Sequence, residues 1–135
     1  MSLLSSNSNH LHFLKLGYKI FYPITNKMSC KSCNIIYLIA CNKCYKQYVG
    51  QTSRKLKDRL NDYRCNIKIH KNTTIAVHFN NPLHTIFNLS ITPIEQINSK
   101  STTELLHREQ FWMTILHTKC PHSLNNIHSY KKNLQ

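Results

Sequence analysis

The chain has 135 residues, a length that fits one domain or one domain with a tail. Lysine and arginine number 18 against 5 aspartates and glutamates, so the formal net charge is +13. This excess favours a nucleic-acid partner, and no apolar run approaches the roughly 20 residues of a membrane span. Six cysteines are too few for a disulfide scaffold, so a Cys-x-x-Cys pair here predicts metal binding in a reducing compartment.

The N-terminal region is difficult to assign to an element. Serine and asparagine dominate residues 1–10, a composition typical of disorder. Residues 11–24 mix apolar and basic side chains without a clean period, which fits either a strand or the remnant of a larger upstream region. We therefore predict a tail or remnant over residues 1–29, a folded domain over residues 30–128 and a basic tail over residues 129–135.

A β-hairpin is predicted over residues 34–49, because an apolar run is followed by a polar loop and a second short segment. In one register of this hairpin Tyr37 lies opposite Tyr48. The same register places Cys41 opposite Cys44, since both pairs of residue numbers have the same sum. Two phenols and two thiols would then lie side by side.

The next predicted element is a helix that runs to about residue 66 and is capped by Thr52 or Ser53. Its buried face is expected to consist of three residues at helical spacing, Leu56, Leu60 and Tyr63. Arg59 lies at the border of this face, where an arginine either covers the core edge or points at a phosphate. The other basic residues of this region are candidate nucleic-acid contacts: Arg54, Lys55, Lys57, Arg64 and Lys68.

The second half of the domain is predicted to hold two helices with a strand between them. A short helix over residues 75–79 ends at a turn over residues 80–82, and the strand covers residues 89–97. Ser101 or Thr102 caps the last helix, which runs to about residue 117. Its core stripe is expected to be Leu105, Leu106, Trp112, Met113 and Leu116.

Glu109 is an acidic residue predicted to face inward, because it lies four positions after Leu105 and three before Trp112. A buried carboxylate is costly unless it is paired, so Glu109 should bind either an arginine or a metal. Arg59 and Arg108 are the candidate arginines. We favour the metal, because the other acids of the chain are less well placed for a buried site.

Two sets of metal ligands compete for the cysteines. A four-cysteine site would include Cys33 and Cys41, which lie about 26 Å apart if eight residues of strand separate them. Thiolates on one zinc lie within about 4 Å of each other. The better set is Cys41, Cys44, His78 and His84, with Pro82 supplying a turn between the histidines. The alternative is a pair of surface histidines beside a metal-free hairpin; the remaining cysteines are Cys30, Cys33, Cys65 and Cys120.

Six blocks of the sequence follow one another in a recognisable order: Asn-Ile-Ile-Tyr-Leu-Ile (34–39), Lys-Gln-Tyr-Val-Gly-Gln-Thr (46–52), Leu-Lys-Asp-Arg-Leu (56–60), Ala-Val-His-Phe-Asn (76–80), Arg-Glu-Gln-Phe-Trp (108–112) and Pro-His-Ser-Leu-Asn (121–125). Together they resemble the GIY-YIG nuclease superfamily, and more closely the endonuclease domain of Penelope-like retroelements. The resemblance implies an α+β fold in which a small three-stranded antiparallel sheet is flanked by helices. It also implies a zinc knuckle in the first hairpin, from a Cys-Cys-His-His motif that matches the set above.

The resemblance further implies roles for individual residues. The catalytic residues would be Tyr37, Tyr48, Arg59, Tyr63, Glu109 and Asn125. Glu109 would hold a catalytic Mg²⁺ or Mn²⁺, and the zinc would be structural. Ile35 and Ser123 depart from the family pattern, because glycines are usual at both positions. A phenol has a pKa near 10, so a tyrosine that deprotonates water is expected to have its pKa lowered by neighbouring cations such as Arg59, the metal or nearby lysines.

We therefore expect a metal-dependent DNA endonuclease that nicks a phosphodiester bond. In a Penelope-like element such a nick primes reverse transcription, so the resemblance implies an RNA template and a reverse transcriptase as further partners. It also implies a nuclear protein, in keeping with the lack of a signal-peptide pattern. The alternative is a catalytically inactive, zinc-stabilised nucleic-acid-binding module. That alternative leaves the inward Glu109 and the order of the tyrosines and Arg59 unexplained.

Overall fold

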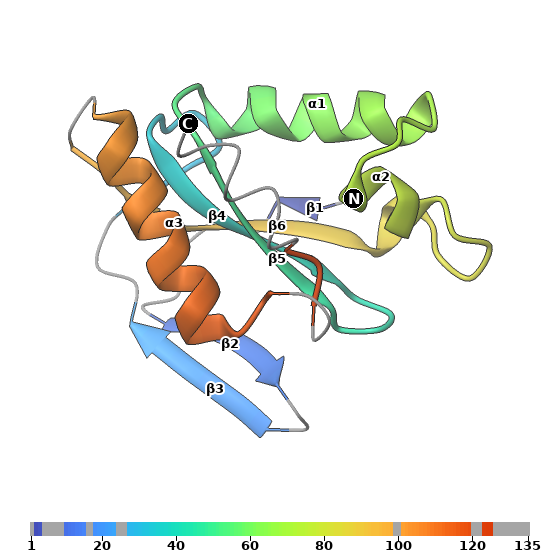
Figure 1. Ribbon diagram of the computed structural model, residues 1–135, viewed down its shortest axis with the longest axis horizontal. Helices are drawn as coiled ribbons and strands as arrows, with labels where there is room; N and C mark the ends of the chain where they lie inside the picture. The colour runs from blue at the N-terminus through green and yellow to red at the C-terminus, as the bar shows by residue number, and fades with distance from the viewer. Residues whose placement is uncertain are drawn as a thin grey trace.

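A small antiparallel sheet forms the centre of the computed structural model, which describes residues 2–3, 10–15, 18–23, 27–98, 101–119 and 123–125 (Figure 1). Its strands are β4 (Ile35–Cys41), β5 (Gln47–Thr52) and β6 (Leu89–Gln96), with β4 in the middle. A two-residue strand, β1 (Ser2–Leu3), pairs in parallel with β6 and extends the sheet to four strands. The predicted α+β fold with three antiparallel strands is confirmed.

Three α-helices flank the sheet, as predicted: α1 (Leu56–Lys68), α2 (Thr74–Phe79) and α3 (Thr102–Leu116), and a 3-10 turn, η1 (Ile86–Asn88), precedes β6. The predicted cap of α3 is confirmed, because the Ser101 hydroxyl accepts a hydrogen bond from Glu104 N at 3.4 Å. Most of the predicted stripe of α3 is buried, but Leu106 is only half-buried.

Both faces of the central strand β4 are covered, because apolar side chains alternate to both sides of it. Ile36 and Leu38 belong to a core with α3, whereas Ile35, Tyr37 and Ile39 belong to a core with α1 and α2. Each of these side chains is at most 3% exposed. The strand is therefore shared by two cores, and Ile35 fits one of them although glycine is usual at its position.

The N-terminus of α1 is capped by backbone groups, and the predicted caps Thr52 and Ser53 are wrong. Lys55 is the N-cap residue, and its side chain makes no capping hydrogen bond. Instead, the carbonyl oxygens of Ser32 and Cys30 accept hydrogen bonds of 3.1 and 2.8 Å from the first two N–H groups of the helix. The loop before β4 thus supplies the acceptors that a helix N-terminus requires.

The β4–β5 hairpin has a register shifted by two residues from the predicted one. Tyr37 lies opposite Gly50, and Tyr48 lies opposite Ile39, so both predicted cross-strand pairs, of tyrosines and of cysteines, are wrong. The turn is longer than predicted, because Tyr45 adopts a left-handed conformation with φ of 63° and bonds back to the last residue of β4. A shift of two residues keeps every side chain on its face, so both tyrosines still lie on the same face.

The N-terminal region contains a second hairpin, formed by β2 (His10–Lys15) and β3 (Tyr18–Pro23). Most of residues 1–10, for which we predicted disorder, and all of the predicted basic tail over residues 129–135 lie outside the described residues. Among the residues that are described, no helix is both long and apolar enough to cross a membrane.

Candidate active site and metal site

Tyr37 and Gly50, on neighbouring strands, form the floor of the candidate active site. Tyr37 is fully buried, and its ring lies directly against Gly50. A Cβ atom at position 50 would lie 2.4 Å from both Cζ and Oη of Tyr37, a separation that real structures essentially never show. Glycine alone permits this approach, so Gly50 fixes where the Tyr37 hydroxyl lies.

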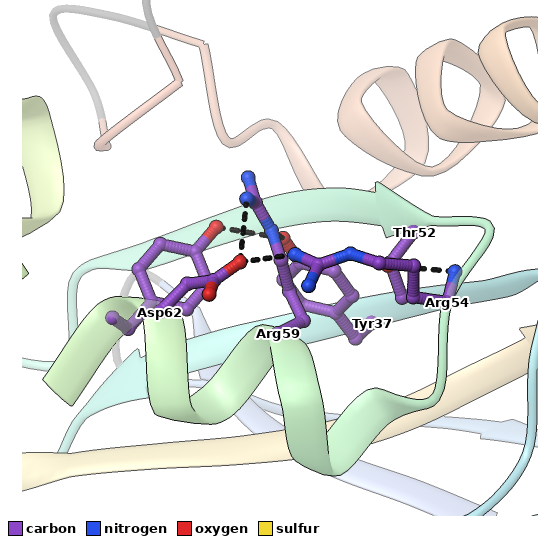
Figure 2. Close-up of polar contacts among 6 residues, drawn as sticks. Tyr37, Thr52, Arg54, Arg59 and Asp62 are labelled. Carbon is purple, nitrogen blue, oxygen red and sulfur yellow. Dashed lines mark hydrogen bonds and ion pairs between the residues drawn. The ribbon is translucent and has the colours of Figure 1, made fainter. Parts of the chain in front are cut away.

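The hydroxyl of Tyr37 lies at the centre of a polar cluster under α1 (Figure 2). Arg59 and Tyr63 reach it from that helix, where a spacing of four residues places them on one side. Arg59 Nε donates a hydrogen bond of 3.1 Å to Tyr37 Oη, and Tyr63 Oη lies 2.6 Å from the same atom. The Arg59 guanidinium also lies over the Tyr63 ring, 4.9 Å from its centroid. Arg59 therefore points into the cluster.

Burial raises the pKa of the three tyrosines, Tyr37, Tyr48 and Tyr63, above the usual value of a phenol. The positive charge of Arg59 acts in the opposite direction on each of them but does not outweigh burial. The expected lowering of a tyrosine pKa is therefore wrong for the protein without ligands, and all three phenols are neutral at neutral pH. Tyr48 differs from the other two in having partly exposed surface.

Glu109 comes from α3, which covers the other face of the sheet, and its side chain is half-buried. It forms no ion pair with any described residue. Each of the two candidate arginines has another acidic partner: Arg108 binds Glu95, and Nη1 of Arg59 lies 3.7 Å from Oδ2 of Asp62. Burial raises the pKa of Glu109 to about 7, against the opposing charge of Arg59. Glu109 in turn raises the pKa of the two strand tyrosines, so it lies within electrostatic reach of them.

Residues 123–125 run along the outer edge of β5 and satisfy its backbone. The Ser123 hydroxyl accepts a hydrogen bond of 2.5 Å from Gln47 N and donates one of 2.6 Å to Gln47 O. The Asn125 side chain accepts from Val49 N and donates to Val49 O, each at 2.8 Å. Both ends of this amide are bonded to the backbone of Val49 and the residue is 2% exposed, so Asn125 holds this segment against β5.

The predicted metal ligands come together at the turn of the hairpin. One ligand atom from each of Cys41, Cys44, His78 and His84 lies within 4.8 Å of all the others. Cys44 Sγ and His78 Nε2 are 3.5 Å apart, close to the roughly 3.6 Å expected between sulfur and nitrogen ligands of one tetrahedral zinc. Both ring nitrogens of His84 are buried with no hydrogen-bond partner among the described residues, and a metal ion would satisfy one of them.

Two further features of the metal site suit a cation. Burial lowers the pKa of His78, which keeps its ring in the neutral form that binds metals. The Asn81–His84 segment turns through Pro82, with His84 N bonded to Asn81 O at 2.8 Å, and thereby brings His84 beside His78. The donor set fits zinc, and the part of the chain that is described holds no other group of three or more such ligands.

The basic residues predicted to contact nucleic acid are all exposed: Arg54, Lys55, Lys57, Arg64 and Lys68. Asp62 is a residue of the site that sequence reasoning missed: it forms an ion pair with Arg54. The i,i+3 spacing of Asp62 from Arg59 on α1 was the available signal for this acid.

Residues 33–119, more than half of the chain, match the family model described as the GIY-YIG catalytic domain. Together with the fold and the site, this match defines a nuclease domain of the endonuclease type. The chain belongs to the GIY-YIG family, whose nucleases are metal-dependent and act on DNA. No curated protein and no solved structure matches the chain.

Proposed function

We propose that this protein is a metal-dependent endonuclease that hydrolyses DNA phosphodiester bonds by nicking one strand. The observation that carries the proposal is the half-buried Glu109, which lacks an ion pair among the described residues and lies within electrostatic reach of Arg59 and the tyrosines. An unpaired carboxylate is costly in such a place unless a cation binds it. Glu109 is thus the residue that would hold Mg²⁺ or Mn²⁺.

Arg59 would bind the scissile phosphate. Its Nε atom already donates to Tyr37 Oη, which orients the guanidinium, and its terminal nitrogens, of which Nη1 lies 3.7 Å from Asp62 Oδ2, would donate to non-bridging oxygens. Such charge-assisted hydrogen bonds strengthen as negative charge develops on the phosphoryl oxygens. A divalent ion at Glu109 would supply Lewis-acid stabilisation of the leaving oxygen.

A tyrosine, Tyr48 or Tyr37, would accept the proton of the attacking water. Tyr48 is the first candidate because it has exposed surface, whereas Tyr37 is fully buried between Arg59 and Tyr63. The raised pKa values make neutral phenols poor bases in the free protein. Because the charge of Glu109 contributes to that rise, neutralising this carboxylate makes both phenols easier to deprotonate. Asn125 would act by positioning the strand that carries Tyr48.

The cysteine and histidine cluster would hold a structural zinc. Four protein ligands, Cys41, Cys44, His78 and His84, leave no open position for a substrate. The ion would instead fix the long turn of the hairpin to α2, which carries His78, and to the loop after it, which carries His84. The hairpin carries both Tyr37 and Tyr48, so zinc would support the active site indirectly.

The wider role we propose is that of a Penelope-like retroelement endonuclease acting in the nucleus. The six-block resemblance supports this role, in which the nick leaves a 3′-hydroxyl that a reverse transcriptase extends on an RNA template. The domain would occupy residues 30–128, between an N-terminal tail or remnant over residues 1–29 and a basic tail over residues 129–135. Five exposed basic residues would follow the DNA backbone: Arg54, Lys55, Lys57, Arg64 and Lys68.

The test is conversion of supercoiled plasmid to open circle in the presence of Mg²⁺. We expect cleavage by the wild type and at least about a 10³-fold slower reaction by Glu109→Ala. Glu104→Ala, which removes an exposed acid from the same helix, should cleave normally. Normal cutting by Glu109→Ala would show that the assignment of the metal to this residue is wrong. Failure of a folded, zinc-loaded, DNA-binding wild type to cut would favour the inactive binding module.

A further inference from the structure

Asp62 lies between two arginines at the exposed side of the proposed phosphate site (Figure 2). It forms an ion pair with Arg54 and lies 3.7 Å from Nη1 of Arg59. The side chains of Asp62, Arg54 and Arg59 are 40%, 54% and 35% exposed, so a DNA strand can reach all three. A carboxylate thus occupies the space where the proposed substrate would bring its own anion.

The backbone of Arg54 is held in place by the fold, and its side chain by the ion pair. The Thr52 hydroxyl is in a buried residue and accepts a hydrogen bond of 3.2 Å from Arg54 N, which fixes the bend between β5 and α1. The pair between Arg54 and Asp62 therefore joins this bend to the second turn of α1. Arg54 and Arg59 consequently share one carboxylate although they come from different elements.

We infer that Asp62 is a built-in competitor for the DNA phosphate. In the free protein its carboxylate occupies Arg54 and Arg59, and on DNA binding a backbone phosphate replaces it on Arg54. The inference rests on the proposed function and adds Arg54 to Arg59 as a second arginine of the phosphate site. Carboxylates and phosphates accept hydrogen bonds from the guanidinium fork with similar geometry, so the exchange requires no rearrangement of the arginine.

This competition has a measurable cost for binding. The displaced Asp62 remains close to the incoming phosphate, and two like charges at such a separation repel each other. DNA must therefore offset both the lost ion pair and the repulsion, so the wild type gains little affinity from Arg54. Without the carboxylate, Arg54 would contribute its full phosphate contact.

The alternative is that Asp62 and Arg54 form a simple surface ion pair, and this alternative differs from our inference in DNA affinity and not in stability. Exposed pairs contribute little to stability, so Asp62→Asn should leave the melting temperature nearly unchanged in either case. A simple pair, however, predicts that Asp62 and Arg54 affect DNA affinity additively, apart from their net charge. Coupling between the two residues in DNA binding is therefore the property that separates the two accounts.

The experiment is a double-mutant cycle on DNA affinity, measured by fluorescence anisotropy with a short duplex. The full-length chain carries Glu109→Ala throughout and no divalent ion is added, so that binding is read without cleavage. We expect Asp62→Asn to raise affinity about tenfold. The matched control is Asp58→Asn, the same charge change one turn earlier on α1 at a residue with no ion pair among those described; it should change affinity less than about threefold.

The second side of the cycle is Arg54→Ala. It should lower affinity about twofold when Asp62 is present and about tenfold or more in the Asp62→Asn protein. Equal losses in the two backgrounds would overturn the inference while leaving the proposed function intact, and so would a loss of affinity in Asp62→Asn. Absence of DNA binding in every variant would overturn the inference and the proposed function together.

Discussion

The two polar clusters of the β4–β5 hairpin differ in how complete they are without a ligand. Around Tyr37, the polar groups are bonded to one another, since its hydroxyl already engages Arg59 and Tyr63. At the turn, four potential ligands converge, yet no group in the described part of the chain forms a hydrogen bond with the buried nitrogens of His84. The first cluster is held by the protein alone, whereas the second has the ligands for a metal ion. Changes at the turn should therefore affect folding, and changes around Tyr37 should affect chemistry.

Glu109 lies near the tyrosine cluster but, unlike the hydroxyls of that cluster, has a polar group without a partner in the part of the chain that is described. It belongs to the tyrosine cluster by its electrostatic effect on Tyr37 and Tyr48, but its carboxylate, like the ring nitrogens of His84, has no ion-pair or hydrogen-bond partner among the described residues. The Tyr37 and Tyr63 hydroxyls are thus hydrogen-bonded within the cluster, whereas the Glu109 carboxylate has no partner among the described residues. That combination is what a site needs in order to fold without its catalytic ion and bind it later.

The largest expected effect is on stability, from Cys41→Ser. Cys41 is 1% exposed and is one of the four candidate ligands. Loss of a structural zinc site removes several kcal/mol from the free energy of unfolding, so we expect the melting temperature to fall by more than about 10 °C. Thermal denaturation with a parallel zinc assay measures this effect. Cys65→Ser, at an exposed cysteine of α1, is the control and should melt and bind zinc like the wild type.

Gly50→Ala tests the tyrosine cluster directly and should have the next largest effect. The new methyl group would meet Tyr37 at 2.4 Å, so either the ring or the strand must move. Overpacking of this kind costs about 1–3 kcal/mol, and we expect a loss of about 3 kcal/mol together with loss of cleavage. Chemical denaturation measures the first quantity. Combining Gly50→Ala with Tyr37→Leu should recover part of the stability but no activity; no recovery would show that the contact with Tyr37 is not the cause.

The raised pKa of Glu109 predicts a pH dependence of stability. In the folded protein this pKa is about 7, above the ordinary value of 4.5, so the folded state holds the proton more tightly. Its contribution to stability is present at low pH and is lost as the pH rises from about 4.5 to about 7. We expect zinc-loaded wild type without Mg²⁺ to lose about 2 kcal/mol relative to Glu109→Gln over this range, after allowance for partial exposure.

Addition of Mg²⁺ sharpens the same comparison. A cation competes with the proton for the Glu109 carboxylate, so saturating Mg²⁺ should flatten or reverse the loss of stability in the wild type and leave Glu109→Gln unchanged. Parallel pH profiles of the two proteins that do not respond to Mg²⁺ would contradict a metal site at this residue.

What could be predicted from the sequence was set by local spacing. The Ser101 cap of α3 follows from a local capping pattern and the direction of Glu109 from helical periodicity, and the structure has the cap and a half-buried Glu109. The candidate metal ligands were also predictable, because of the two sets considered only one satisfied both the length of a strand and the size of a zinc site. In each of these cases the spacing of residues along the chain is enough to predict where the side chains lie.

The errors came from backbone contacts that no local pattern encodes. The hairpin register depends on the left-handed conformation of Tyr45, a residue type that is uncommon in it. The cap of α1 comes from carbonyl groups about two dozen residues upstream, and the partner of Asn125 is the backbone of Val49, 76 residues away. The tyrosine pKa values were misjudged because burial, which the sequence does not quantify, outweighs the charge of Arg59.

The smallest predicted effects come from two buried hydroxyls that differ in their partners. Ser123→Ala removes the group that bonds both backbone atoms of Gln47 and leaves a buried N–H without that acceptor, which should cost about 1–2 kcal/mol. The Thr118 hydroxyl is buried and has no hydrogen-bond partner among the residues that the structure describes, so Thr118→Val should be neutral or slightly stabilising. Denaturation midpoints of the two variants measure the difference. Equal losses would mean that the hydrogen bonds along the edge of β5 contribute nothing beyond packing, and the positioning role of residues 123–125 would then be wrong.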